Sequence, residues 1–161
     1  MTAKSVRSAS EPVASDERIQ TALKLLVTLA RAYNSVIVHL ENDIKRHGLT
    51  QAEFGVLEML FHTGPQLLGE IQRKILVSSG GITFVVDKLV AKGLVERQDC
   101  PTDRRARYAA LTPAGEKLIA RIFPGHAERV ASVMATLGPT QQKELTRLLR
   151  ELGQGAQELS P

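Results

Sequence analysis

Apolar residues recur at helical spacing along the first part of the chain. They fall at steps of three and four and form one stripe over about eight helical turns: Ile19, Leu23, Leu26, Ala30, Tyr33, Ile37, Leu40 and Ile44. A helix of this length usually spans an interface or supports a second chain. Gly48 follows the stripe and is expected to stop the helix.

A second helix is predicted directly after Gly48. Thr50 and Glu53 have the spacing of a capping box, in which each side chain satisfies a backbone amide of the other residue. Gly-Pro at residues 64–65 should end this helix. Residues 66–68 are compatible with a minor strand, and residues 69–76 read as a brief helix.

The pattern between residues 78 and 112 predicts a helix followed by a two-stranded hairpin. The inner face of the helix is marked by Ile82, Val85, Val86, Leu89 and Val90. Residues 94–97 alternate as a strand would, residues 99–105 form a polar turn, and a returning strand carries Tyr108, Ala110 and Leu111. Thr112 and Pro113 then start a helix to about residue 136, and a last helix carries Leu145, Leu148, Leu149 and Leu152.

These elements predict a mainly α fold with a small β-wing: a winged helix-turn-helix over residues 50–112, with further helices before and after it. The expected domain runs from residue 16 to residue 158, after a polar, disordered tail over residues 1–15. That tail lacks the apolar stretch of a secretory signal, and no run of 18 apolar residues occurs. We therefore expect a cytoplasmic protein without a membrane span.

Most of the net positive charge of the chain lies in the same segment. The formal net charge is +4, and residues 65–112 hold eight basic and five acidic residues, so this segment accounts for +3 of it. A basic segment with this element order suits a nucleic-acid partner. The single cysteine, Cys100, excludes an internal disulfide framework, and the four histidines form no compact metal motif, so no cofactor is expected.

The second helix of a helix-turn-helix places its N-terminal residues on base edges in the major groove. Here those residues are Ser78, Ser79, Gly80, Gly81 and Thr83. Hydroxyls can bond bases and phosphates, and the glycines allow a close backbone approach. The alternative is a serine cap followed by turn glycines. Lys88 and Lys92, further along, should meet phosphate or solvent rather than bases.

The tip of the hairpin carries Asp103, Arg104 and Arg105. An arginine there could enter the minor groove, where the negative potential is strong, with a neighbouring carboxylate orienting it. The alternative is an ordinary solvated turn. The joint occurrence of turn, helix, strand and basic hairpin favours DNA binding.

Together these motifs resemble the MarR family of bacterial winged-helix transcription regulators. The resemblance covers about residues 17–152 and rests on four matching stretches: residues 78–83 (SSGGIT), 92–97 (KGLVER), 100–105 (CPTDRR) and 111–115 (LTPAG). It implies a homodimer, with residues 16–47 and 113–158 as dimerisation helices, bound to a pseudo-palindromic DNA operator, usually as a repressor. In the wing it implies that Arg105 enters the minor groove and that Asp103 holds it.

The resemblance also implies release from DNA by a small aromatic or phenolic ligand. Tyr33, His39 and His62 could face such a ligand, although packing or solvent exposure is the commoner role of such residues. A redox response through Cys100 is one alternative, and a protein-protein adaptor without DNA binding is another. An enzyme is not expected, because the sequence has no phosphate loop, nucleophile elbow or paired carboxylate motif.

Overall fold

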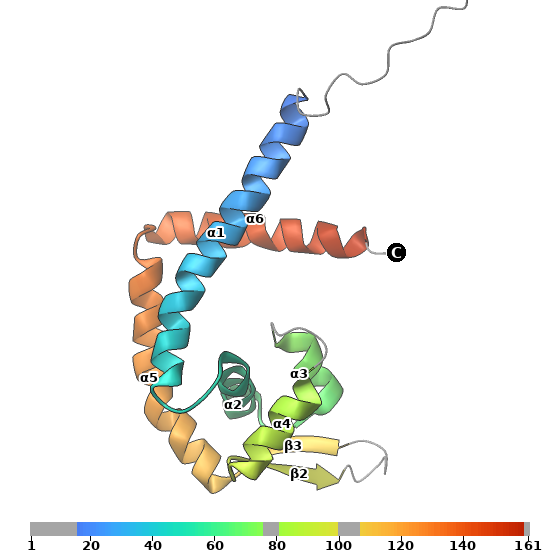
Figure 1. The fold of residues 1–161 in the computed structure, drawn as a ribbon, viewed down its shortest axis with the longest axis vertical. Helices are drawn as coiled ribbons and strands as arrows, with labels where there is room; N and C mark the ends of the chain where they lie inside the picture. Colours follow the sequence, from blue (N-terminus) through green and yellow to red (C-terminus); the bar gives the residue numbers. More distant parts are fainter. Residues whose placement is uncertain (1–15, 76–80, 100–106, 160–161) are drawn as a thin grey trace, which may run out of the picture. The chain divides into compact units, whose positions relative to one another are not determined.

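The computed structural model describes residues 16–75, 81–99 and 107–159 (Figure 1). The chain divides into two compact units, residues 1–38 and 39–161. The first unit contains most of the helix α1 (Glu17–Lys45). Along this part of α1 the large apolar side chains are exposed: Leu23, Leu25, Leu26, Val27, Tyr33 and Val38. Of the stripe predicted from the sequence, Leu23, Leu26 and Tyr33 are therefore exposed among the described residues, whereas Ile44, in the second unit, is buried.

By length and composition, α1 is apolar enough to cross a membrane, and it is the one such helix in the described ranges. It contains no unbroken run of 18 apolar residues, as the sequence indicated, because Lys24 and Arg31 interrupt it. One helix of this kind is weak evidence for a membrane span. A helix that buries its apolar stripe against another chain has the same composition.

The second unit follows the predicted order of elements. It contains α2 (Gln51–Thr63), β1 (Gln66–Leu67), α3 (Leu68–Lys74), α4 (Ile82–Ala91), β2 (Val95–Asp99), β3 (Arg107–Leu111), α5 (Pro113–Met134) and α6 (Pro139–Glu158). The predicted fold class, mainly α with a small β-wing, is confirmed.

The predicted boundaries of α2 are confirmed by its hydrogen bonds. The Thr50 amide donates to Glu53 Oε2 at 2.7 Å, and the Glu53 amide donates to Thr50 Oγ1 at 3.2 Å, which completes the capping box. Gly48 precedes the helix with a φ of 71° and Gly64 ends it with a φ of 72°. Glycine adopts this left-handed region without the steric cost that a side chain would bring.

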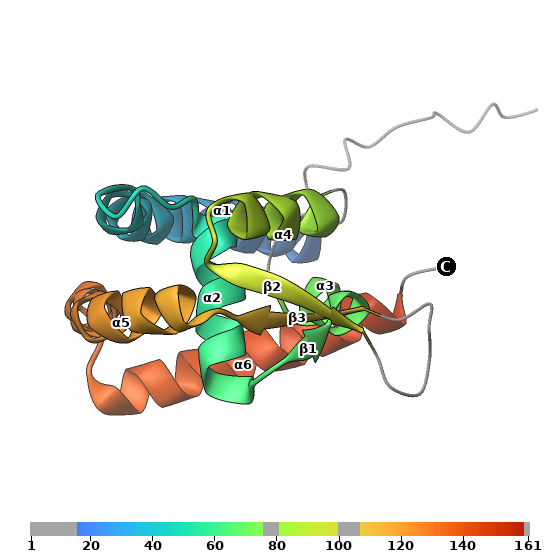
Figure 2. The same cartoon turned by 90° about the horizontal axis from the view of Figure 1, so that it is seen from below.

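The three strands form one antiparallel sheet in the order β1-β3-β2 (Figure 2). Val95 pairs with Leu111 and Asp99 with Arg107, so β2 and β3 form the two-stranded arm that we call the wing. Asp99 lies in the strand and not in the polar turn predicted for it. It pairs with Arg107 across the two strands, so the ladder reaches two positions beyond the predicted end of the strand at residue 97.

The core of the second unit joins the helix-turn-helix to α5. Ile71 of α3, Val86 and Leu89 of α4, Leu57 of α2 and Ile119 of α5 have no exposed side-chain surface. Of the apolar face predicted for α4, Val86 and Leu89 are buried and Ile82 and Val85 are half-buried, whereas Val90 is 38% exposed and does not pack inward as predicted. Apolar contacts within this shared core therefore fix the position of α4.

Candidate nucleic-acid interface

The helix α4 presents its outer face to solvent. Thr83, Phe84, Asp87 and Lys88 are exposed, whereas Val86 and Leu89 are buried on the opposite face. This alternation follows the 100° turn per residue of an α-helix. The second helix of the helix-turn-helix thus has an outer surface available to a groove.

The start of α4 differs from the sequence-based prediction. We expected Ser78, Ser79, Gly80, Gly81 and Thr83 to form its first turn. The helix begins at Ile82, Gly81 takes the N-cap position, and Thr83 lies in the first turn. Consecutive glycines favour a cap over a helical turn, because each costs about 1 kcal/mol in a helix interior. Ser78, Ser79 and Gly80 lie outside the described residues.

Two ion pairs hold α4 from outside the apolar core. The Lys92 ammonium, just beyond the end of α4, lies 2.8 Å from Glu53 Oε1 and donates to the Gly48 carbonyl at 3.0 Å. Arg97 of β2 pairs with Asp87 on the outer face of α4 at 2.7 Å. The Lys92 ammonium is thus engaged by partners within the chain, while 39% of its side chain stays exposed.

The carboxylate of Glu53 is almost fully buried, with 2% of the residue exposed. Burial raises its pKa, but hydrogen bonds from Lys92 and Thr50, with the positive charge of Lys92, outweigh burial and hold the pKa of Glu53 below its usual range. The carboxylate is therefore charged at neutral pH, and it links the start of α2 to the end of α4.

The end of α4 is also tied to the start of α5. Gly93, with a φ of 67°, turns the chain so that the Leu94 amide donates to the Leu89 carbonyl. The Thr112 hydroxyl donates to the Gly93 carbonyl at 2.6 Å and accepts from the Gly115 amide at 3.1 Å. The Thr112 side chain therefore caps the N-terminus of α5 and also binds the glycine that follows the C-terminus of α4.

The wing begins beside this junction. Its described residues end at Asp99 on β2 and resume at Arg107 on β3, and these two residues form an ion pair. The predicted tip residues Asp103, Arg104 and Arg105 lie outside the described residues, as does Cys100. Their DNA contacts stay predictions.

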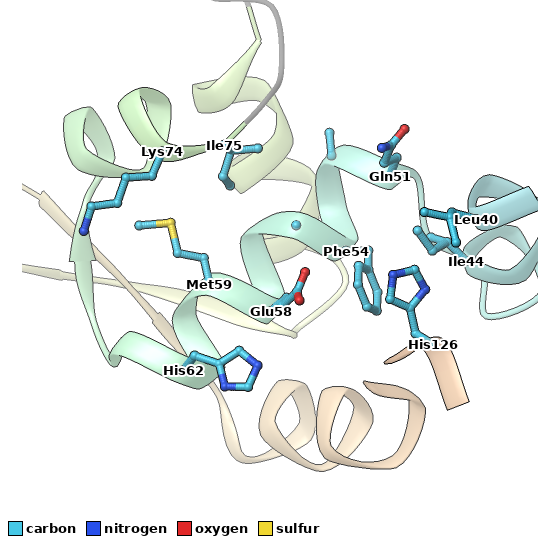
Figure 3. A pocket seen from close by; sticks show the side chains of 12 residues that line it. Leu40, Ile44, Gln51, Phe54, Glu58, Met59, His62, Lys74, Ile75 and His126 are labelled. Atoms are coloured by element: carbon cyan, nitrogen blue, oxygen red, sulfur yellow. The ribbon is translucent and has the colours of Figure 1, made fainter. Parts of the chain in front are cut away.

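A cavity of about 450 Å³ opens between α2, the end of α1, α3 and α5 (Figure 3). The volume lies in the range of small-molecule sites, roughly 300–1,000 Å³. Its walls come from residues of the second unit: Leu40, Ile44, Gln51, Ala52, Phe54, Gly55, Glu58, Met59, His62, Lys74, Ile75 and His126.

His126 is the one side chain of the described residues with a buried nitrogen or oxygen atom that lacks a hydrogen-bond partner. Its ring lies beside the Phe54 ring (Figure 3), with 4.4 Å between the centroids. Its Nδ1 is 3.6 Å from Asp43 Oδ2, which is too far for a good hydrogen bond. A buried polar atom of this kind costs stability until a partner reaches it.

The three residues proposed for the ligand site fall in different places. His62 lines the cavity. His39 is exposed and absent from the lining, and Tyr33, in the first unit, is 52% exposed.

Sequence reasoning missed His126, because a lone histidine 72 positions from the phenylalanine that it contacts leaves no pattern in the chain. Phe84 was detectable, because it falls outside the apolar face predicted for α4.

Comparison with known proteins gives the family. The MarR family model matches residues 49–106. The HTH-type transcriptional regulator MhqR of Bacillus subtilis is 42% identical over 139 residues, which cover 86% of this chain and 96% of that protein.

Two solved structures share the fold along most of the chain. Sco3205 of Streptomyces coelicolor, a MarR family regulator in complex with DNA, has a TM-score of 0.77 and 26% identity, covering 86% of this chain and 91% of its own. BpsR of Bordetella bronchiseptica, whose DNA binding is regulated by 6-hydroxynicotinic acid, has a TM-score of 0.72 and 27% identity, covering 81% and 98%. The chain therefore belongs to the MarR family of DNA-binding transcriptional regulators.

Proposed function

We propose that this chain is a homodimeric repressor, released from a pseudo-palindromic operator by a small aromatic or phenolic ligand. The observation that carries the proposal is the outer face of α4, which is exposed and also fixed in position by Glu53, Asp87 and Thr112 through their partners. A recognition helix held this firmly can enter a major groove without losing further conformational freedom.

The proposed DNA contacts divide by role. Ser78, Ser79, Gly80, Gly81 and Thr83 read bases or approach the backbone, and Lys88 neutralises phosphate. In the wing, Arg105 enters the minor groove, Asp103 orients it and Arg104 adds charge.

The proposed dimer has a physical basis in α6. Leu145, Leu148, Leu149 and Leu152 recur at helical spacing, and each is between 40% and 47% exposed. A second copy of the chain would cover this stripe and the apolar face of α1, so that residues 16–47 and 113–158 form the dimerisation region. Two copies of α4 then require two operator half-sites. A soluble DNA-bound dimer of this kind works in the cytoplasm.

The proposed effector site is the cavity beside His126. Phe54 and Met59 offer apolar contact to an aromatic ring, and the imidazole of His126, which lines the cavity, can exchange one hydrogen bond with a ligand hydroxyl or carboxylate. The regulation of BpsR by 6-hydroxynicotinic acid shows that a hydroxylated aromatic acid regulates a protein of this fold. We propose a ligand of this chemical class here.

Selection of bound duplexes from random DNA tests the operator. The full-length protein should enrich one sequence with two related half-sites, and the affinity should fall steeply with salt, because bound phosphates release counterions. Failure to enrich any duplex would favour the adaptor without DNA binding.

Thermal shift with a panel of hydroxylated aromatic acids, including 6-hydroxynicotinic acid, tests the effector. A ligand at one hundred times its Kd should stabilise the protein by about 2.7 kcal/mol and release the selected duplex. The variant His126→Phe keeps the ring contact with Phe54 but lacks the nitrogen, so it should lose most of this shift. Equal shifts in both proteins would place the ligand elsewhere.

A further inference from the structure

Phe84 is the most exposed aromatic residue of the described part of the chain, with 61% of its surface accessible. It lies on α4, opposite the buried side chains of Val86 and Leu89. Leaving a phenylalanine in water forgoes the favourable transfer of its ring into an apolar environment. An exposed ring in the middle of a recognition surface therefore calls for a partner outside this chain.

The ring of Phe84 is held in a defined position. The Lys88 ammonium lies over the ring, 4.5 Å from its centroid, as the spacing of one helical turn allows. This contact restrains the ring on the outer face of α4 and leaves its remaining surface exposed. Lys88 also puts a positive charge beside an apolar group, a combination that suits a methyl-bearing base next to a phosphate.

The acidic neighbour on this face is neutralised. Asp87, the carboxylate next to Phe84 and Lys88 on the outer face, pairs with Arg97 of β2 at 2.7 Å. Thr83, beside the ring, adds an exposed hydroxyl. The face around Phe84 thus joins an apolar ring, a hydroxyl and the Lys88 ammonium, which forms no ion pair among the described residues.

We infer that Phe84 is a specificity-determining residue that contacts the C5-methyl group of a thymine in the major groove. Thymine alone of the four bases presents a methyl group there, and an aromatic ring, which lacks a hydrogen-bonding group of its own, can distinguish a base through that methyl. The inference rests on the proposed DNA binding. It adds apolar readout of thymine to the polar contacts assigned to Thr83 and its neighbours.

Replacement of thymine by deoxyuridine tests this directly, because it removes only the methyl group. The strongest duplex from the random selection would be remade with each thymine replaced in turn, in both half-sites, and the Kd of the full-length protein measured at constant salt. For the wild type, one position per half-site should weaken binding about fourfold, or about fifteenfold when both half-sites are changed.

The variant Phe84→Ala should bind the thymine duplex more weakly and should no longer distinguish it from the deoxyuridine duplex. Val90→Ala provides the matched control, because it also removes apolar surface from α4 but lies about 120° around the helix from Phe84. Val90→Ala should keep the wild-type preference for thymine. Circular dichroism checks that both variants fold.

Three outcomes would overturn the inference. The wild type could bind every deoxyuridine duplex as tightly as its thymine parent, or Phe84→Ala could keep the preference for thymine. Phe84→Ala could also change the sedimentation coefficient of the free protein, which would assign the ring to a protein interface. These results differ from failure of DNA binding itself, in which no duplex is enriched at all.

Discussion

Lys92 lies 2.8 Å from the buried carboxylate of Glu53 and joins the end of the recognition helix to the start of α2. The two residues are 39 positions apart in sequence. The same ammonium group donates to the Gly48 carbonyl at the junction of α1 and α2. A movement at that junction would therefore displace the Gly48 carbonyl, which accepts a hydrogen bond from Lys92. This contact connects the recognition helix α4 directly to α1, one of the helices of the proposed dimer.

Removing one partner of this pair should destabilise the protein. Lys92→Met leaves Glu53 buried with its capping contacts but without its cation, and we expect a loss of about 1–2 kcal/mol, discounted because the Lys92 side chain is 39% exposed. Urea unfolding measures this loss. Lys45→Met, which breaks an exposed pair with Glu41, is the matched control and should change stability by less than about 0.5 kcal/mol. Equal losses in both variants would contradict the prediction.

The same pair should give stability a pH dependence. The pKa of Glu53 is lowered in the folded state, so its contribution is complete above the ordinary glutamate pKa of about 4.3 and is lost as the pH falls through the lower folded value. Glu53→Gln should flatten the dependence of unfolding free energy on pH below about pH 5. A variant curve parallel to the wild-type curve across that range would show that Glu53 is not responsible.

Lys88 and Lys92 should affect DNA binding in different ways. Lys88→Ala removes a phosphate contact and should reduce the slope of log K against log salt by about 0.9 per subunit. Lys92→Met should weaken binding without changing the slope, because its ammonium is occupied by Glu53 and Gly48. Lys143→Ala, on α6, controls for the lost charge and should change neither quantity. Equal slopes for Lys88→Ala and wild type would exclude the phosphate contact.

Arg105→Ala tests the wing. Removing an arginine from the minor groove should cost about 1–3 kcal/mol of operator affinity. Arg121→Ala, on α5, removes the same charge away from the proposed interface and should have little effect. The measurement compares the Kd of the wild type and of both variants for the selected duplex at one salt concentration. An unchanged affinity for Arg105→Ala would mean that the wing does not use this residue.

Gly115 should not tolerate a side chain. A Cβ there would overlap the backbone carbonyl of Leu94, which holds the end of α4 against the start of α5. We expect Gly115→Ala to destabilise the protein by at least about 2 kcal/mol. Gly125→Ala, in the same helix with open space around it, should be neutral or stabilising by up to about 1 kcal/mol. Thermal unfolding compares the two, and similar melting temperatures would contradict the close approach.

The leucine stripe of α6 should hold the dimer. Leu148→Asp combined with Leu152→Asp places two charges in the proposed interface, and sedimentation velocity should then detect a monomer. Gln154→Asp adds a charge about 180° around the helix from the centre of the stripe and should leave the dimer intact. A double variant that stays dimeric at the same concentration would show that the stripe serves another partner.

The sequence by itself determined the local features of the fold. The capping box of Thr50 and Glu53, the left-handed Gly64, and the Thr112-Pro113 start of α5 each depend on hydrogen bonds within a few residues. Such contacts follow from short-range geometry, and therefore the order of elements was predictable, whereas the start of α4 and the end of β2 were not. The motifs from residue 78 to residue 115 added the family, which the comparisons confirmed.

Only the tertiary structure decided which side chains meet across elements. It paired Lys92 with Glu53, and it set His126 against Phe54 beside a cavity. It also showed that Phe84 has no cover within the described chain. The physical reason is common to all three. Periodicity records which face of a helix is apolar, whereas a long-range contact depends on how several packed faces place two side chains that the sequence separates by tens of residues.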